Sequence, residues 1–163
     1  MNEINKEELP EAVSLAASIL FQLRAETVEL MDLRGIKDVT DFFLVATCES
    51  EAQMQAILNE LTKEFKARKL SSLGVEYKSG VRWAIFDAGL DLMVHLFEET
   101  KREEISLERL YSDGVITMLN ENDFVSSVPM RKKTISEVSV QFSDFAESTA
   151  NVSPAPSKAT PVT

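Results

Sequence analysis

The chain has few of the side chains that redox and cofactor-dependent proteins use. Its 163 residues include one cysteine, Cys48, and one histidine. One cysteine excludes an intramolecular disulfide, and one cysteine with one histidine cannot supply the ligands of a structural zinc site. None of the five glycines belongs to a GxGxxG or GxxxxGK[ST] phosphate-binding loop. We therefore expect no cofactor and no resident metal.

Long apolar runs and positive charge are also scarce. No window approaches the roughly 18 uninterrupted apolar residues of a membrane span, and residues 1–12 are acidic where a signal peptide is basic. The sequence therefore predicts a cytosolic protein with no membrane association. The 17 Lys and Arg against 27 Asp and Glu give a net charge of −10. Because such a field repels phosphate backbones and attracts positive surfaces, we expect a basic protein partner rather than direct nucleic-acid binding.

The spacing of apolar residues predicts one α/β domain. Helical spacing of three and four occurs twice, and five segments have the pattern of strands: the helices are 8–24 and 52–69, and the strands are 27–33, 40–47, 73–77, 81–87 and 91–97. The segment 40–47 is apolar almost throughout, which is typical of a central strand covered on both faces. A short helix at 106–111 would close the unit. This order predicts a single domain with a mixed β-sheet flanked by helices.

The C-terminal third differs in character, so we place the end of the domain, residues 8–112, before a C-terminal extension at 113–163. Residues 146–163 are mostly Ser, Thr, Ala and Pro and are expected to be disordered, because they bury too little apolar surface to offset the ordering entropy. In residues 113–145 the apolar side chains partly alternate and would form either an added strand or a motif that orders on a partner: Ile135, Val138, Val140, Phe142 and Phe145. The charged run at 98–104 is interpreted as a solvated helix or loop face.

The segment from Gly80 to Phe97 reads as one β-hairpin that carries the only tryptophan and the only histidine of the chain. If residues 88–90 form a three-residue turn, Trp83 faces His95 across the two strands and Asp87 faces Asp91. Because successive side chains of a strand point to opposite faces, these four side chains would lie on one side of the hairpin. The opposite, buried side would carry Ala84, Phe86, Leu92, Val94 and Leu96. A two-residue turn would shift the pairing by one place.

Each polar or aromatic residue of the hairpin admits two interpretations. Trp83 is either a core aromatic or an exposed anchor in a binding patch. His95 is either a satisfied strand histidine or a support for such a patch. Asp87 and Asp91 either cap the turn or, since like charges repel, receive a Lys or Arg of a partner. The second set of interpretations describes a solvent-facing tryptophan surrounded by carboxylates, which suits docking on a basic protein.

A second hypothesis makes the same aspartates catalytic. Asp41, before the central strand, is either a turn former or a further carboxylate on the same rim. If Asp41, Asp87 and Asp91 converged, they could hold the cations of a metal-dependent nucleotidyltransferase-like enzyme. The lack of a glycine-rich phosphate loop argues against this alternative.

Several motifs, taken as a set and in this order, resemble the ribosomal silencing factor family, also called RsfS, Iojap or YbeB. The resemblance covers about residues 8–112. The motifs are Thr40-Asp41-Phe42-Phe43, Leu73-Gly74-Val75-Glu76, Trp83 followed by Asp87-Ala88-Gly89-Leu90-Asp91, Val94-His95, and Leu107-Glu108-Arg109-Leu110-Tyr111.

The resemblance implies a domain related in fold to nucleotidyltransferases but without their activity, so no residue is expected to be catalytic. It implies binding to a basic protein on the intersubunit face of the large ribosomal subunit. There the protein would block joining of the small subunit and repress translation when nutrients are scarce. It also suggests a homodimer when free. The partner-binding residues that match the family motifs are Trp83, Asp87, Asp91, Glu76, Asp41 and His95.

Overall fold

The computed structural model describes residues 5–36 and 40–124, so the predictions for residues 125–163 lie outside the described part. The elements follow one another along the chain as η1 (Lys6–Glu8), α1 (Glu11–Gln22), β1 (Glu26–Asp32), β2 (Phe42–Thr47), α2 (Glu51–Ala67), β3 (Gly74–Tyr77), β4 (Trp83–Asp87), β5 (Leu92–Phe97), α3 (Glu99–Ile105), α4 (Leu107–Leu110), β6 (Val115–Met118) and η2 (Glu121–Asp123). Within the described ranges, no helix combines the length and the apolar character needed to cross a membrane.

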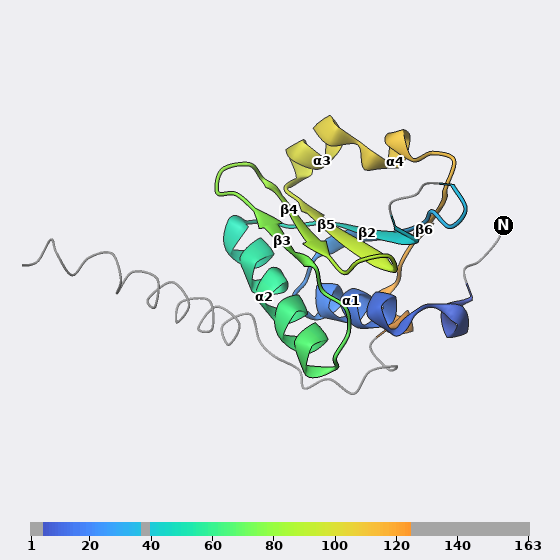
Figure 1. Cartoon of the computed structure of the whole chain (residues 1–163). Coiled ribbons are helices and arrows are strands. Elements are labelled where there is room, and N and C mark those ends of the chain that lie inside the picture. The colour runs from blue at the N-terminus through green and yellow to red at the C-terminus, as the bar shows by residue number, and fades with distance from the viewer. Residues whose placement is uncertain (1–4, 37–39, 125–163) are drawn as a thin grey trace, which may run out of the picture.

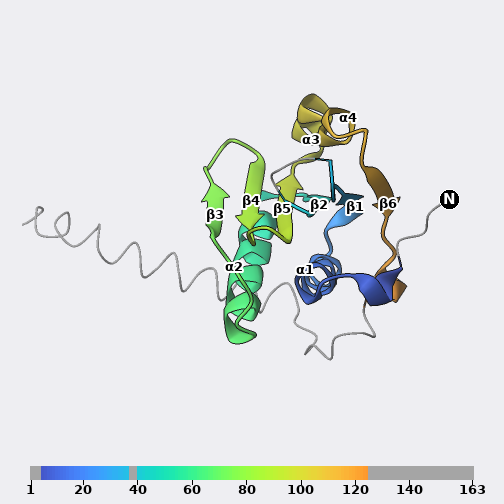
Figure 2. The ribbon, with the colours of Figure 1, turned by 45° about the vertical axis from the view of Figure 1, so that its right-hand side comes forward.

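The strands of the described residues form one six-stranded sheet in the order β3-β4-β5-β2-β1-β6. β2 and β5 pair in parallel, and all other neighbours are antiparallel. Helices α1 and α2 lie on one face, and the short helices α3 and α4 lie on the other (Figures 1 and 2). The predicted mixed sheet flanked by helices is confirmed.

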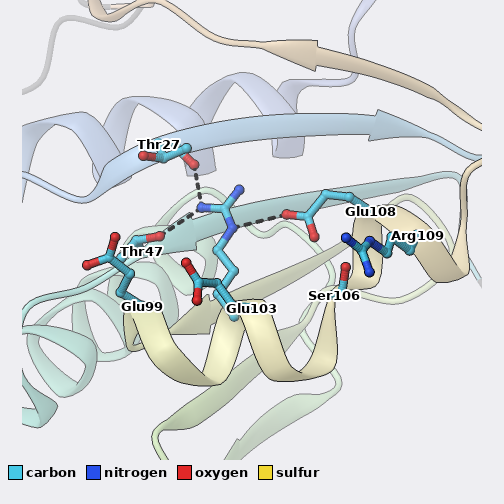
Figure 3. Close-up of a pocket in the computed structure, with 8 residues that line it drawn as sticks. Thr27, Thr47, Glu99, Glu103, Ser106, Glu108 and Arg109 are labelled. Carbon is cyan, nitrogen blue, oxygen red and sulfur yellow. Dashed lines mark hydrogen bonds and ion pairs between the residues drawn. The ribbon is translucent and has the colours of Figure 1, made fainter.

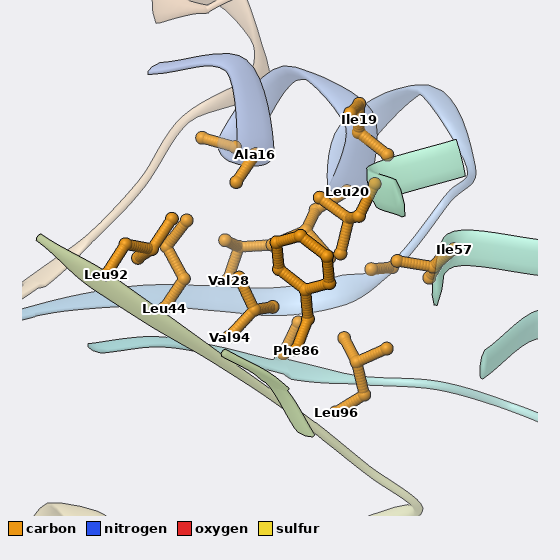
Figure 4. Close-up of a cluster of buried hydrophobic side chains, with 14 of the residues drawn as sticks. Ala16, Ile19, Leu20, Val28, Leu44, Ile57, Phe86, Leu92, Val94 and Leu96 are labelled. Carbon is orange, nitrogen blue, oxygen red and sulfur yellow. The ribbon is translucent and has the colours of Figure 1, made fainter. Parts of the chain in front are cut away.

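The main core lies between the sheet and α1 with α2. Figure 4 shows Phe86, Val94 and Leu96 of the β4–β5 hairpin meeting Leu20 and Ile57 of the two helices. All five are fully buried, and side chains of this size stabilise a fold by about 1.5–3 kcal/mol each on burial. The alternation of side chains along the two strands predicted that this face of the hairpin is the buried one.

A second, smaller core lies between the sheet and α3 with α4. Its buried members come from the middle of the sheet and from α4: Met31, Leu33, Phe43, Val45, Phe97 and Leu107. Trp83 packs against the margin of this cluster. Every residue of β2 except Thr47 is buried, which confirms the prediction of a strand covered on both sides.

Cys48, the residue after β2, is buried at the junction between β2 and α2. Its side chain is 2% exposed, and its N–H donates to the Phe97 carbonyl at 2.7 Å. Burial raises the pKa of the Cys48 thiol to about 12.

The fold continues past residue 112, where sequence analysis placed the end of the domain. β6 pairs with β1, and Phe124 is buried against α1, where its carbonyl accepts a hydrogen bond from Ser18 Oγ at 3.0 Å. The charged run forms helix α3, and most of its charges face solvent as expected. Arg102 is the exception, with 9% of its surface exposed.

The register of the β4–β5 hairpin differs from both predicted alternatives. Trp83 pairs with Phe97, Ile85 with His95, and Asp87 with Met93, so the predicted Trp83–His95 and Asp87–Asp91 pairs are wrong. Asp87 Oδ1 accepts the Gly89 N–H at 2.8 Å, and the connection lengthens to residues 88–91. The pairing therefore moves by two places. Because strands have a period of two, the assignment of side chains to the two faces is unaffected.

Arg102 joins α3 to β1, β2 and α4 through contacts with Thr27, Thr47 and Glu108, which are labelled in Figure 3. Its Nη1 donates to the Thr27 carbonyl at 2.7 Å and to Thr47 Oγ1 at 2.8 Å, and its Nε donates to Glu108 Oε1 at 3.0 Å. Its Nη2 lies 3.1 Å from Glu29 Oε2. Burial raises the pKa of Glu29, against the opposing effect of the guanidinium. These contacts hold the small helical layer on the sheet.

A polar cavity of about 510 Å³ opens beside this guanidinium. Its lining combines acidic, basic and hydroxyl side chains from β1, β2, α3, α4 and the residue that joins the two short helices (Figure 3): Thr27, Thr47, Glu99, Arg102, Glu103, Ser106, Glu108 and Arg109.

We predict that Arg102→Met lowers the free energy of unfolding by about 3 kcal/mol, because Glu29 and Glu108 lose their buried partner. Arg82→Met is the matched control. Arg82 is 47% exposed and pairs with Glu98 at 2.9 Å, so its loss should cost less than about 1 kcal/mol. Urea unfolding of both variants measures the difference. Equal losses would contradict the role given to Arg102.

Candidate functional site

The predicted site residues on the strands share the face of the sheet that carries α3 and α4. Glu76, Ile85 and His95 lie in one row across β3, β4 and β5. Trp83 and Asp87 lie two places to either side on β4, and therefore point to the same side. The two short helices cover the middle of this face and leave β3 bare, with Glu76 exposed. We call the bare part, over β3 and β4, the hairpin face.

Trp83 is half-buried, so it is neither a fully enclosed core aromatic nor a fully exposed side chain. Its indole stacks on Phe97 with ring centroids 5.2 Å apart and an interplanar angle of 21°. Its Nε1 donates a hydrogen bond to His95 Nδ1 at 3.2 Å. The ring therefore joins the small core to the hairpin face, and the remainder of its surface is available to solvent.

His95 supports this arrangement from below. It is 4% exposed, and Phe43 packs edge-on against its ring at 4.6 Å between centroids. Burial lowers the pKa of His95 to about 4, so the imidazole is neutral at physiological pH. Since Nδ1 accepts the indole hydrogen bond, Nε2 carries the proton, and this atom has no hydrogen-bond partner among the described residues.

The three aspartates lie at the other end of the hairpin. Asp41 and Asp91 are exposed, and Asp87 is half-buried with Oδ1 engaged by the Gly89 N–H. The Asp41 N–H donates to the Leu90 carbonyl at 2.8 Å, so the start of β2 is fastened to the β4–β5 turn. We call this region the hairpin tip: residues 87–91 with Asp41 and Leu73.

The carboxylates do not surround the tryptophan. Trp83 and Asp87 are the first and last residues of β4, which places them about 13 Å apart at the rise of a β-strand. Glu76 is the carboxylate in between, one row from Trp83 on the neighbouring strand. The expected tryptophan with a ring of acids is thus corrected to an elongated face, aromatic at one end and acidic at the other.

The aspartates also do not form the cluster that the transferase hypothesis requires. Across residues 5–36 and 40–124, no three His, Cys, Asp or Glu side chains are placed to hold a metal ion together. Asp41, Asp87 and Asp91 are all within these ranges, so the geometry gives that hypothesis no support.

Sequence reasoning missed two residues of the hairpin tip. Leu90 is 80% exposed and Leu73 is 72% exposed, the highest values among the large apolar side chains described. For Leu90, the sequence did contain a signal: it is a leucine between Gly89 and Asp91 in a turn, where a polar residue is usual.

The fold and this surface are those of a small α/β protein that presents an acidic and partly apolar face. A family model described as "Ribosomal silencing factor during starvation" (RsfS) matches residues 6–150. The chain belongs to this family.

Curated relatives include proteins named ribosomal silencing factor RsfS and a protein named Iojap. The ribosomal silencing factor RsfS of Halalkalibacterium halodurans is 34% identical over 104 residues, which span 64% of this chain and 88% of the relative. That of Bacillus subtilis is 31% identical over 108 residues, 66% of this chain and 91% of the relative. The chloroplastic protein Iojap of Zea mays is 28% identical over 103 residues, 63% of this chain and 44% of the relative.

Two crystal structures resemble this one. A protein from Bacillus halodurans superposes with a TM-score of 0.57 at 32% identity, covering 67% of this chain and 98% of its own. A protein from Chromobacterium violaceum superposes with a TM-score of 0.60 at 21% identity, covering 79% of this chain and 98% of its own. The second likeness is one of fold.

We predict that His95 makes the fold sensitive to mild acid. Its pKa falls from the model-peptide value of 6.5 to about 4 on folding, so between these values the unfolded chain binds more protons than the folded one. Stability is therefore complete above pH 6.5 and decreases as the pH falls. The expected loss is about 1 kcal/mol between pH 7 and 5.5.

Urea unfolding at the two pH values measures this loss, with His95→Gln as a variant in which the dependence should flatten. Because the chain has one histidine, its ring signals in a proton NMR titration report the same group. An imidazole that titrates with a midpoint near 6.5 in the folded protein would contradict the prediction.

Proposed function

We propose that this chain is a ribosomal silencing factor that acts by occupancy in the cytoplasm. It docks its hairpin face on a basic protein at the intersubunit face of the large ribosomal subunit. Its bulk then blocks joining of the small subunit and represses translation when nutrients are limiting. No bond is made or broken, so no residue is assigned a catalytic role. The protein is proposed to be a homodimer when it is free.

The observation that carries the proposal is the acidic face left bare by the short helical layer. Glu76 is exposed on it, Asp41 and Asp91 are exposed at the adjoining hairpin tip, and the half-buried Trp83 adds an aromatic surface. Complementary charge speeds encounter and fixes orientation, while a partly desolvated aromatic ring adds binding energy. With a net charge of −10, the chain would approach an RNA-rich particle through a positively charged protein patch.

Family membership supports the same conclusion, because the matched relatives are named as ribosomal silencing factors. In this proposal Asp41, Asp87, Asp91 and Glu76 receive Lys or Arg side chains of the partner. Trp83 contributes apolar contact, and His95 holds its indole in place.

Sedimentation of the full chain with separated ribosomal subunits tests the proposal. We expect the chain to sediment with large subunits and not with small ones. Binding should weaken as salt rises, because the screening length falls from about 10 Å at 0.1 M to about 3 Å at 1 M. Absence of binding to large subunits, or equal binding to both subunits, would refute it.

We predict that Trp83→Ala weakens large-subunit binding by about 2 kcal/mol, which is about thirtyfold in affinity. Trp83→Phe is the matched variant: it keeps an aromatic ring against Phe97 but loses the indole N–H, and should retain more of the affinity. Circular dichroism and urea unfolding identify any loss of folded protein. Undiminished binding of a folded Trp83→Ala variant would show that the tryptophan is not an anchor.

A further inference from the structure

The hairpin tip presents an apolar surface that the six predicted site residues do not account for. Leu90 and Leu73 are 80% and 72% exposed. Leu90 follows Gly89 in the chain, and Leu73 lies beside it in space. A methyl group built on Gly89 would lie 3.9 Å from Cγ and Cδ1 of Leu73, so this side chain reaches the turn that carries Leu90. Exposed apolar side chains that gather in one place mark interaction sites more often than single ones do.

Hydrogen bonds from three separate segments hold this surface in one shape. The Leu73 N–H donates to the Asp87 carbonyl at 2.8 Å, and the Leu90 carbonyl accepts the Asp41 N–H at 2.8 Å. Thr40 Oγ1 donates toward the carbonyls of Gly89 and Leu90 at 3.1 and 3.0 Å. A surface that is already ordered loses less conformational entropy on binding than a mobile loop does.

Negative charge surrounds the two leucines. Asp91 follows Leu90 directly and is exposed, and the exposed Asp41 is joined to the Leu90 carbonyl. Interfaces commonly have an apolar centre and a charged rim, and the rim selects the partner by complementarity. The complementary surface is an apolar patch bordered by Lys or Arg. A second copy of this chain fits poorly, because a two-fold contact here would place the aspartates of the two copies against one another.

We propose that Leu73 and Leu90 form the apolar anchor by which the hairpin tip seats on a basic protein surface. The inference rests on the proposed function and deepens it: the partner is the basic ribosomal protein, and the residues that meet its apolar patch are the two leucines. Trp83, at the far end of β4, is then a second contact, separate from the one that the two leucines make.

The test uses the full chain and purified large subunits, with affinity measured by sedimentation at one fixed salt concentration. The double variant Leu73→Ser, Leu90→Ser should bind at least about tenfold more weakly than the unmodified chain. The matched control is Met118→Ser, which removes a side chain 58% exposed on β6, at the opposite edge of the sheet. The control should remain within about twofold of the unmodified chain.

A salt series separates the leucines from the aspartates. Asp91→Asn should reduce the dependence of affinity on salt, whereas the leucine variants should lower affinity and leave that dependence unchanged. Since both leucines are exposed, thermal unfolding of the double variant should match that of the unmodified chain. The single variant Leu90→Gln serves if the double variant folds poorly.

The outcomes distinguish this inference from the function on which it rests. If the unmodified chain binds large subunits and the folded leucine variants bind equally well, the anchor is refuted and the proposed function stands. If Met118→Ser weakens binding as much as the leucine variants do, the anchor is also refuted. If the unmodified chain does not bind large subunits, both proposals are overturned.

Discussion

The parallel pairing of β2 with β5 determines most of this structure. A strand pair of this kind sits in the middle of the sheet and is apolar on both faces, so both faces must be covered. One side is covered by α1 and α2, which together extend across the sheet. The other side has only the seven residues of α3 and the four of α4, enough to cover β1, β2 and β5. The bare face over β3 and β4 exists because this second layer is short.

Two sets of contacts hold the short layer and the bare face together. Under α3, Arg102 takes the place of apolar packing and holds four polar partners in a low-dielectric site. Such an arrangement is stable only while its buried charges remain paired. Trp83, His95 and Phe97 form the second set, in which stacking and one side-chain hydrogen bond continue the small core outward to the exposed strands. The proposed docking surface is therefore continuous with the interior and is not an isolated loop.

The sequence predicts helices α1 and α2, strands β1 to β5 and the two faces of the hairpin, because periodicity depends only on which side chains must be buried. It did not predict the hairpin register, because the length of the connection and the bond from the Gly89 N–H to the side chain of Asp87 are properties of the folded turn. β6 was missed because its short apolar run is largely exposed at an edge. The family motifs indicated which residues belong to the candidate site, but not that the length of β4 separates the tryptophan from the aspartates. Leu73 and Leu90 were missed because exposure in a turn is a property of the folded chain.

The burial of Cys48 has a practical consequence. Alkylating reagents attack the thiolate, and this thiol is both enclosed and held in its protonated form by its surroundings. Modification of the native protein therefore requires the junction between β2 and α2 to open first. Because the chain has no other cysteine, the rate at which the protein is labelled reports how readily that junction opens. It can be read in dilute samples and in crude mixtures without introducing a probe.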